Sequence, residues 1–227
     1  MHSTKTEILA LLKRNGGRSV NELATALHLA PITIRQHLTH LERDGLVVSE
    51  QRNGSSGRPT LAFRLTAKAH AAAFPRRSDR LAELLLREIG LLDGPELEGL
   101  TSPDKTRLVL QRLAQHLADE YAPLLQGWPL GERVAFVTEV MHADGGFAEW
   151  SPTDTGYEIR DFNCLFHRLL DGESEPCEWH RTLLSRLLGA EVRVIPCPGD
   201  HRPCCRYLIE AAPTAEGGAA QTTESTR

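Results

Sequence analysis

The sequence predicts an α+β protein with an N-terminal helical module ending in a β-hairpin, a helical connection, and a C-terminal α+β cysteine-bearing domain with a small antiparallel sheet. Three observations support this fold class. Apolar residues recur at helical spacing between Thr4 and Gly45, and two strand patterns follow them. Two amphipathic helical patterns occupy the middle of the chain. Near the C-terminus, five cysteines lie among alternating helix and strand patterns.

The first helix is expected over residues 4–13. Ile8, Leu9 and Leu12 recur there at helical spacing. Asn15, Gly16 and Gly17 follow, and these residues tolerate the positive φ that commonly ends a helix.

The second and third helices have distinct start signals. Ser19 can cap the second helix, and Glu22 three residues later completes a capping box. Pro31 suits the first position of the third helix, because its missing N–H needs no partner there. The third helix has one apolar stripe, formed by Ile34, Leu38 and Leu41.

Two short strands follow the third helix. Residues 46–48 and 61–65 have strand patterns, and the turn-forming residues 53–57 lie between them. Three helices with a tight turn between the last two, followed by a hairpin, make a winged helix-turn-helix. The segments 19–24, 33–38, 41–47 and 57–59 resemble those of bacterial winged-helix transcription regulators, which implies binding to a double-stranded DNA operator.

The apolar stripe of the third helix decides which side chains can reach DNA. With that stripe buried, other residues of the helix point outward and can read base edges in the major groove. These are Thr33, Arg35, Gln36 and His40. Arg52, Arg58 and Arg64 on the wing are expected to contact phosphate or the minor groove.

The charge distribution agrees with a DNA-binding module. The 227-residue chain has a net charge of -4, yet residues 1–80 hold 13 Lys and Arg against 6 Asp and Glu, a balance of +7. The remainder is acidic, with a balance of -11. Such asymmetry indicates a nucleic-acid-facing module joined to an acidic domain.

The chain is expected to divide into four parts. Residues 1–74 form the winged helix-turn-helix, 75–128 a helical linker or dimerisation region, 129–210 the sensor domain, and 211–227 a disordered tail. An alanine-rich helix over 67–73 precedes a break at Pro75, and amphipathic helices over 81–89 and 106–125 follow. Either amphipathic helix could contact a second copy or pack within its own subunit. A homodimer is expected, because paired half-sites add specificity.

The C-terminal domain alternates helix and strand patterns. Residues 151–156 are expected to form a turn-rich loop between its first two strands. Strands are predicted over residues 147–150, 157–162, 192–195 and 206–209, and helices over 132–142, 165–170 and 179–188.

The five cysteines lie at predicted element junctions, which suggests a single site. They are Cys164, Cys177, Cys197, Cys204 and Cys205. A chain of this length does not need disulfides to fold. It has no secretory leader pattern or membrane-length apolar run, so a cytoplasmic protein without membrane contact is expected. In a reducing compartment, clustered thiols are more often metal ligands or redox groups.

The cysteine segment resembles the SufR-type iron-sulfur transcription repressors. The resemblance lies in the segment 163–169, in Cys177, in Gly199 with Asp200, and in the segment 205–209. It implies that Cys164, Cys177 and Cys205 hold an iron-sulfur cluster, 4Fe-4S rather than 2Fe-2S, and that the protein represses iron-sulfur cluster assembly genes according to cluster state. Leu165 replaces the family's usual proline. Cys197 and Cys204 are additional thiols and leave the fourth ligand open.

Three other chemistries remain open. Cys164 with His167 and Cys177 with His180 are spaced three residues apart, so two Cys and two His could hold zinc. A thiol redox sensor could use Cys204 or Cys205 as its resolving cysteine. A cysteine-dependent enzyme is less favoured, because no phosphate loop or hydrolase motif accompanies the thiols. The sequence therefore predicts a regulator and not an enzyme.

Overall fold

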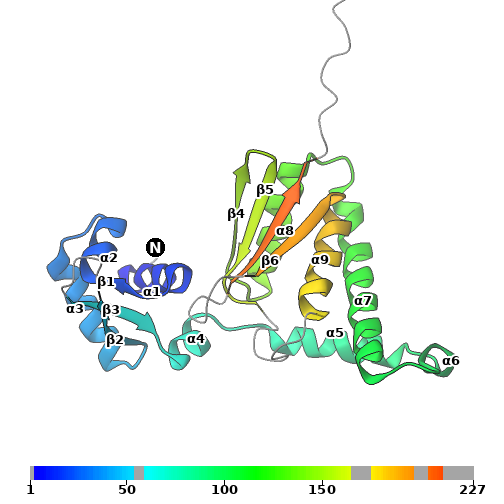
Figure 1. Ribbon diagram of the computed structural model, residues 1–227, viewed down its shortest axis with the longest axis horizontal. Helices are drawn as coiled ribbons and strands as arrows, with labels where there is room; N and C mark the ends of the chain where they lie inside the picture. Colours follow the sequence, from blue (N-terminus) through cyan, green and yellow to red (C-terminus); the bar gives the residue numbers. More distant parts are fainter. Residues whose placement is uncertain (1–2, 54–58, 165–174, 197–203, 212–227) are drawn as a thin grey trace, which may run out of the picture.

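The computed structural model describes residues 3–53, 59–164, 175–196 and 204–211. Two bodies follow one another along the chain (Figure 1). The N-terminal module and the larger C-terminal body are joined by the connecting segment, residues 74–77. The architecture is α+β, as predicted.

The N-terminal module is a winged helix-turn-helix. Its helices and strands are α1 (Thr4–Asn15), β1 (Arg18–Ser19), α2 (Val20–Leu27), α3 (Pro31–Arg43), β2 (Val47–Asn53), β3 (Pro59–Leu65) and α4 (Ala67–Ala73). The three strands form an antiparallel sheet in the order β1-β3-β2. The predicted capping box is confirmed: the Ser19 N–H donates to Glu22 Oε2 at 2.7 Å, and the Glu22 N–H donates to Ser19 Oγ at 3.3 Å.

The helices and the hairpin share one core. The predicted stripes of α1 and α3 are buried in it, and Phe63 and Leu65 reach it from β3. Sequence reasoning missed β1, a two-residue strand paired with β3, and it ended β2 too early. The run of apolar residues stops at Val48, whereas the pairing of β2 with β3 continues through polar residues as far as Asn53.

The C-terminal body combines five α-helices, a 3-10 helix and a four-stranded sheet in its described part. The helices are α5 (Ser78–Gly90), α6 (Gly94–Leu97), α7 (Ser102–Tyr121), η1 (Ala122–Leu125), α8 (Leu130–Ala143) and α9 (Glu175–Leu188). The strands are β4 (Ala148–Thr153), β5 (Gly156–Asp161), β6 (Glu191–Pro196) and β7 (Cys205–Glu210). All are antiparallel, in the order β4-β5-β7-β6.

Helices cover one face of this sheet. Ile159, Tyr207 and Ile209 point from the sheet into a core that Val134 of α8 and Leu184 of α9 complete. The α7 helix packs along α9, and both reach a second apolar cluster together with α5. The helical connection is therefore packed onto the C-terminal domain. No helix of the described residues is long and apolar enough to cross a membrane.

Several expected elements differ from those observed. The loop expected over 151–156 is mostly strand, and only Asp154 and Thr155 lie outside β4 and β5. Pro152 suggested a turn, but β4 is an edge strand, where proline is tolerated. The helix expected over 106–125 ends as α helix at Tyr121, and η1 follows. The short helix α6 was not predicted. The helix expected over 165–170 and the tail after residue 211 lie outside the described residues.

Candidate functional site

The exposed face of α3 carries the predicted base-reading residues. Arg35, Gln36 and His40 are exposed, and Thr33 is half-buried, while the apolar stripe beneath them is buried. Within the described part of the chain, the Arg35 guanidinium has neither an ion pair nor a hydrogen bond, so it is available to a ligand. This helix therefore offers polar and cationic groups to a major groove.

One apolar residue on α3 was missed by sequence reasoning. Ile32, in the first turn of the helix, is 61% exposed. Its side chain lies away from the buried stripe, next to the polar face. An apolar group there can contact a thymine methyl group. The sequence did contain a sign of this exposure, because Ile32 does not share the helical spacing of the buried stripe of α3.

The wing is only partly described. Arg52 is exposed on β2, whereas Arg58 lies outside the described residues. Arg64 was expected to be free for phosphate, but its Nε lies 2.6 Å from Glu50 Oε2 on the neighbouring strand. This exposed pair must open before Arg64 can bind phosphate, since Glu50 already neutralises its charge.

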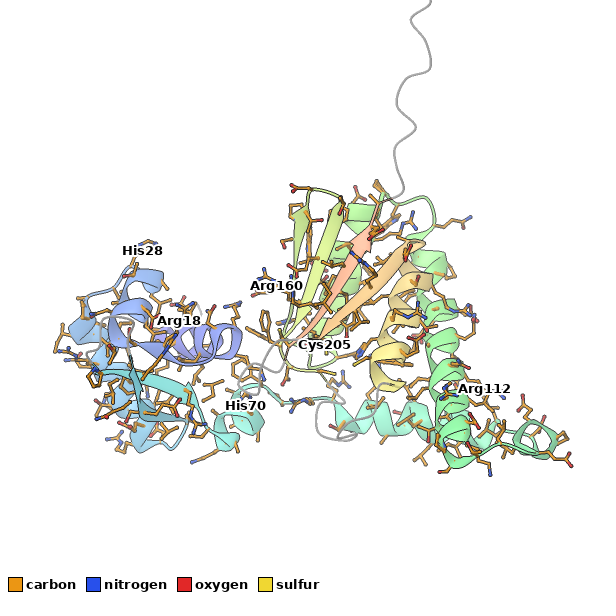
Figure 2. All side chains as sticks on the ribbon, viewed as in Figure 1. Arg18, His28, His70, Arg112, Arg160 and Cys205 are labelled. Atoms are coloured by element: carbon orange, nitrogen blue, oxygen red, sulfur yellow. The ribbon has the colours of Figure 1, made fainter. Side chains whose placement is uncertain are left out.

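Three free thiols come together in the C-terminal body, and we call them the thiol cluster. They belong to Cys164, Cys177 and Cys205, the three residues that the resemblance selects. Cys205 hydrogen-bonds with both of the others. Figure 2 shows Cys205 at the end of the sheet nearest the connecting segment.

Regular secondary structure positions two of the three thiols. Cys177 lies in the first turn of α9, and Cys205 is the first residue of β7. Sequence reasoning had placed both just before their elements, because prolines and neighbouring cysteines suggested loops. Cys164 follows β5 and is 8% exposed. The cluster therefore joins a helix, a strand and the end of another strand.

Two of the three thiols, those of Cys177 and Cys205, have raised pKa values. The pKa of Cys177 is raised well above its ordinary value, chiefly by the hydrogen bond with Cys205 and then by burial. The hydrogen bond with Cys164 and burial raise the pKa of Cys205 to about 12, although Cys177 opposes this shift. The Cys177 and Cys205 thiols are therefore poor nucleophiles in the metal-free protein.

Two buried oxygen groups lie beside the thiol cluster. The Tyr207 side chain is fully buried, and its hydroxyl has no well-formed hydrogen bond among the described residues. The Cys205 sulfur is a polar neighbour of that hydroxyl, and the tyrosine pKa is raised by burial first and then by Cys205 and Asp161. Burial likewise raises the pKa of the Asp161 carboxyl, which accepts the Asn163 backbone N–H at 2.9 Å.

The other candidate ligands are placed differently. Cys204 is disulfide-bonded, so it does not belong to the free thiols. His180 is buried in α9, with its ring 4.3 Å from that of Trp179 and 5.8 Å from that of Tyr207. Cys197 and His167 lie outside the described residues.

The described side chains do not form a preorganised metal site. No group of three or more His, Cys, Asp and Glu residues in these parts of the chain is arranged to hold a metal ion. Cys205 instead hydrogen-bonds with Cys164 and with Cys177. Metal binding would therefore require the thiols to lose their protons and turn toward a common centre.

A buried polar junction links the thiol cluster to the N-terminal module. The Lys13 ammonium of α1 donates to Asn163 Oδ1 at 3.0 Å, and Asn163 precedes Cys164 in the chain. Arg76 of the connecting segment donates to the Cys164 carbonyl at 2.9 Å. Sequence reasoning missed Lys13 and Arg76, because a lysine and an arginine in a basic segment look like solvated DNA-binding groups.

The N-terminal module matches a known family. Residues 1–48 match the family model described as winged helix-turn-helix DNA-binding. Together with the fold and the exposed face of α3, this makes the module a winged helix-turn-helix DNA-binding domain. DNA binding is the activity that this match indicates for residues 1–48.

Solved structures resemble the chain only distantly. A mutant of ZitR from Lactococcus lactis is 21% identical, covering 53% of this chain and 75% of that one, with a TM-score of 0.29. Wild-type Lactococcus lactis ZitR in complex with DNA is 20% identical over the same shares, with a TM-score of 0.27. The transcriptional regulator SlyA is 16% identical over 52% and 76%, with a TM-score of 0.25. No curated protein matched the chain.

Proposed function

We propose that this protein is a transcriptional repressor that binds double-stranded DNA through its winged helix and senses iron-sulfur status at the thiol cluster. The observation that carries the proposal is the meeting of three free thiols from separate elements, Cys164, Cys177 and Cys205. The DNA target of the protein is expected to be the operator of iron-sulfur cluster assembly genes, as the SufR-type resemblance implies.

The donor set fits an iron-sulfur cluster. Cysteine thiolates are the usual ligands of such clusters, and a 4Fe-4S cluster bound by three cysteines leaves one position for another donor. The buried Asp161 carboxyl and Tyr207 hydroxyl lie beside Cys205 and are the oxygen donors available there. A bound cluster would supply a redox-sensitive and oxygen-sensitive group whose presence reports iron and sulfide supply.

The environment of the thiols suits a site with two states, one metal-free and one with a bound cluster. Without metal, the Cys177 and Cys205 thiols stay protonated because their pKa values are raised, and protonated thiols resist oxidation at neutral pH. With metal, the same three sulfurs become thiolate ligands. The two states therefore differ in the charge and in the spacing of three elements of the C-terminal body.

A homodimer is part of this proposal. One winged helix covers a short half-site, and two copies can read paired half-sites. The predicted α7 leucines, Leu110, Leu113 and Leu117, are buried within their own chain. On α5, in contrast, Leu86 and Ile89 remain 69% and 52% exposed, so this face is available to a second copy.

The decisive experiment is anaerobic purification followed by absorption spectroscopy and by iron, sulfide and zinc analysis. Iron and acid-labile sulfide in stoichiometric amounts, with charge-transfer absorption, would support the cluster. Stoichiometric zinc without iron or sulfide would instead establish the zinc alternative. Metal-free protein that cannot be reconstituted, but whose thiols oxidise reversibly, would favour a thiol redox sensor.

A further inference from the structure

The Lys13 ammonium is enclosed at the junction between the two bodies. Its side chain is 7% exposed, and Nζ lies 3.0 Å from both Asn163 Oδ1 and His70 Nδ1. The Phe74 ring centroid is 5.3 Å away. A lysine is rarely buried unless its charge has partners, so these contacts hold Lys13 in one place.

Asn163 uses its whole side chain to join three segments. Its Oδ1 accepts from Lys13, while Nδ2 donates to the Phe74 carbonyl at 3.1 Å and to the Gly145 carbonyl at 2.6 Å. The residue is 1% exposed. Its position is therefore determined jointly by α1, by the connecting segment and by the end of α8.

Asn163 also shares a peptide bond with Cys164. Any change of backbone position that brings the Cys164 sulfur to a metal moves the Asn163 carbonyl and the groups attached to it. Arg76 donates to the Cys164 carbonyl from the connecting segment, so that segment is tied to the same residue. Both contacts connect a residue of the thiol cluster, through its own backbone or its neighbour's side chain, toward the N-terminal module.

The α1 helix, which carries Lys13, packs against α3, the helix expected to read DNA. Leu12, the neighbour of Lys13, packs in the same core as Ile34 and Leu38 of α3. A packed core moves as a unit more readily than it deforms. Displacing α1 relative to the C-terminal body therefore displaces the DNA-reading face of α3.

We propose that Lys13 and Asn163 are the positioning pair through which the state of the thiol cluster sets the orientation of the winged helix. The pair would hold one orientation in the metal-free protein and change it when Cys164 becomes a ligand. Coupling of this kind needs an element that both sites bias. The pair meets that need, because Asn163 precedes Cys164 in the chain and Lys13 belongs to α1, which shares its core with α3. This inference rests on the proposed function for its ligand, but the pair itself can be tested without metal.

A matched control lies on the same helix. Lys5 of α1 pairs with Asp44 at 3.7 Å within the N-terminal module and is 40% exposed. Lys5→Met removes the same charge from α1 without touching the junction. Lys13→Met removes the Lys13–Asn163 contact but leaves the Arg14–Glu149 pair between the two bodies, and Lys13→Arg keeps a cationic donor at the junction. If Lys13→Met does not fold, Asn163→Ala removes the same bond from the other side.

The first measurement uses metal-free full-length protein and the rate of Cys164 alkylation by N-ethylmaleimide, followed by mass spectrometry. Because losing a hydrogen bond to a buried charged group commonly shifts an opening equilibrium about tenfold or more, Lys13→Met should speed Cys164 alkylation by about that factor. Lys5→Met should leave the rate unchanged, and Lys13→Arg should restore most of the protection. Equal rates in the wild type and Lys13→Met would overturn the proposed pairing.

The second measurement is the ratio of DNA affinities with and without reconstitution by ferrous iron and sulfide, using an operator selected from random duplexes. In the wild type this ratio should differ from one. In Lys13→Met it should fall toward one while the cluster absorption is retained. An unchanged ratio would refute the coupling role. A wild type that takes up no iron and sulfide would instead refute the proposed function, and the alkylation result would still decide whether the pair holds the junction.

Discussion

Arg76 Nε donates a hydrogen bond to the backbone carbonyl of Cys164 at 2.9 Å. The connecting segment is thus bonded to a residue of the thiol cluster, 88 positions further along the chain. Nearby, the Arg77 N–H donates to the Asp144 carbonyl at 3.4 Å, and Arg80 pairs with the Asp144 carboxylate at 3.0 Å. The segment between the two bodies is therefore a bonded part of the structure.

Loss of any one cluster thiol should prevent cluster assembly. Cys164→Ser, Cys177→Ser and Cys205→Ser each replace a soft thiolate by a hydroxyl that iron-sulfur clusters rarely accept. Anaerobic reconstitution should leave these variants colourless, whereas Cys197→Ser should keep the absorption of the wild type. A colourless Cys197→Ser beside a coloured Cys205→Ser would show that the ligand assignment is wrong.

Arg35 should contribute base discrimination. Its guanidinium is exposed on α3, and a bidentate contact with guanine accounts for about 1–3 kcal/mol of specificity. Arg35→Ala should therefore weaken binding to a selected operator more than binding to a random duplex, as measured by fluorescence anisotropy. Arg52→Ala on the wing is the control, and it should weaken both about equally and reduce the salt dependence. Equal losses for Arg35→Ala on both duplexes would exclude base reading by this residue.

Gly145 should be intolerant of a side chain. Its φ is +89°, and a Cβ would lie 2.8 Å from the Arg77 nitrogen and the Pro75 oxygen. Gly99 has a similar φ of +76° but no atom within 4 Å of its Cβ position. Gly99→Ala should thus cost only the backbone strain, about 1–2 kcal/mol, and Gly145→Ala should cost distinctly more. Urea unfolding of both variants measures the difference, and equal losses would show that the close approach is harmless.

The metal-free protein should lose stability at alkaline pH. An unfolded cysteine has a pKa of about 8.5, whereas Cys205 is raised to about 12 in the folded protein by its hydrogen bond with Cys164 and by burial. The unfolded chain releases its thiol protons first, so this contribution to stability is complete below the unfolded pKa and decreases as the pH rises toward the folded value. Unfolding midpoints in urea should fall between about pH 7 and about pH 10 more steeply for the wild type than for Cys205→Ala. Parallel curves would contradict the raised pKa.

The exposed face of α5 should support dimer formation. Leu86→Glu places a charge where the side chain is 69% exposed, so folding should be unaffected while burial against a second copy becomes unfavourable. Sedimentation velocity should show a dimer for the wild type and for the control Glu83→Ala, and a monomer for Leu86→Glu. A dimer of Leu86→Glu would exclude this face as the interface.

The winged helix could be predicted nearly completely because its signals are local. The Ser19 capping box, Pro31 at the start of α3 and the apolar stripes each act within a few residues. The junction could not be predicted, because Lys13 and Asn163 are 150 positions apart and neither has an unusual neighbourhood in the sequence. Their pairing results from the packing of two bodies.

The thiol cluster could be predicted less completely than the winged helix but better than the junction. Cys164, Cys177 and Cys205 were selected by resemblance, and the structure brings their thiols together. Whether they bind iron and sulfide stays a prediction. Element boundaries near Cys177 and Cys205 were misjudged, since prolines and paired cysteines resemble loop composition. The placement of Tyr207 and Asp161 beside Cys205 could not be inferred, because only the fold brings them there.

The three thiols differ in the secondary structure that holds their backbones. Cys177 is fixed by the hydrogen bonds of a helix, and Cys205 is paired across the sheet with Asp161 and Pro196. Cys164 alone lies past the end of its strand. Its carbonyl accepts from Arg76, and its neighbour Asn163 accepts from Lys13, so Cys164 is the thiol with bonds toward the N-terminal module. The signal proposed to pass from the thiol cluster to the DNA-binding module would therefore leave the cluster through Cys164.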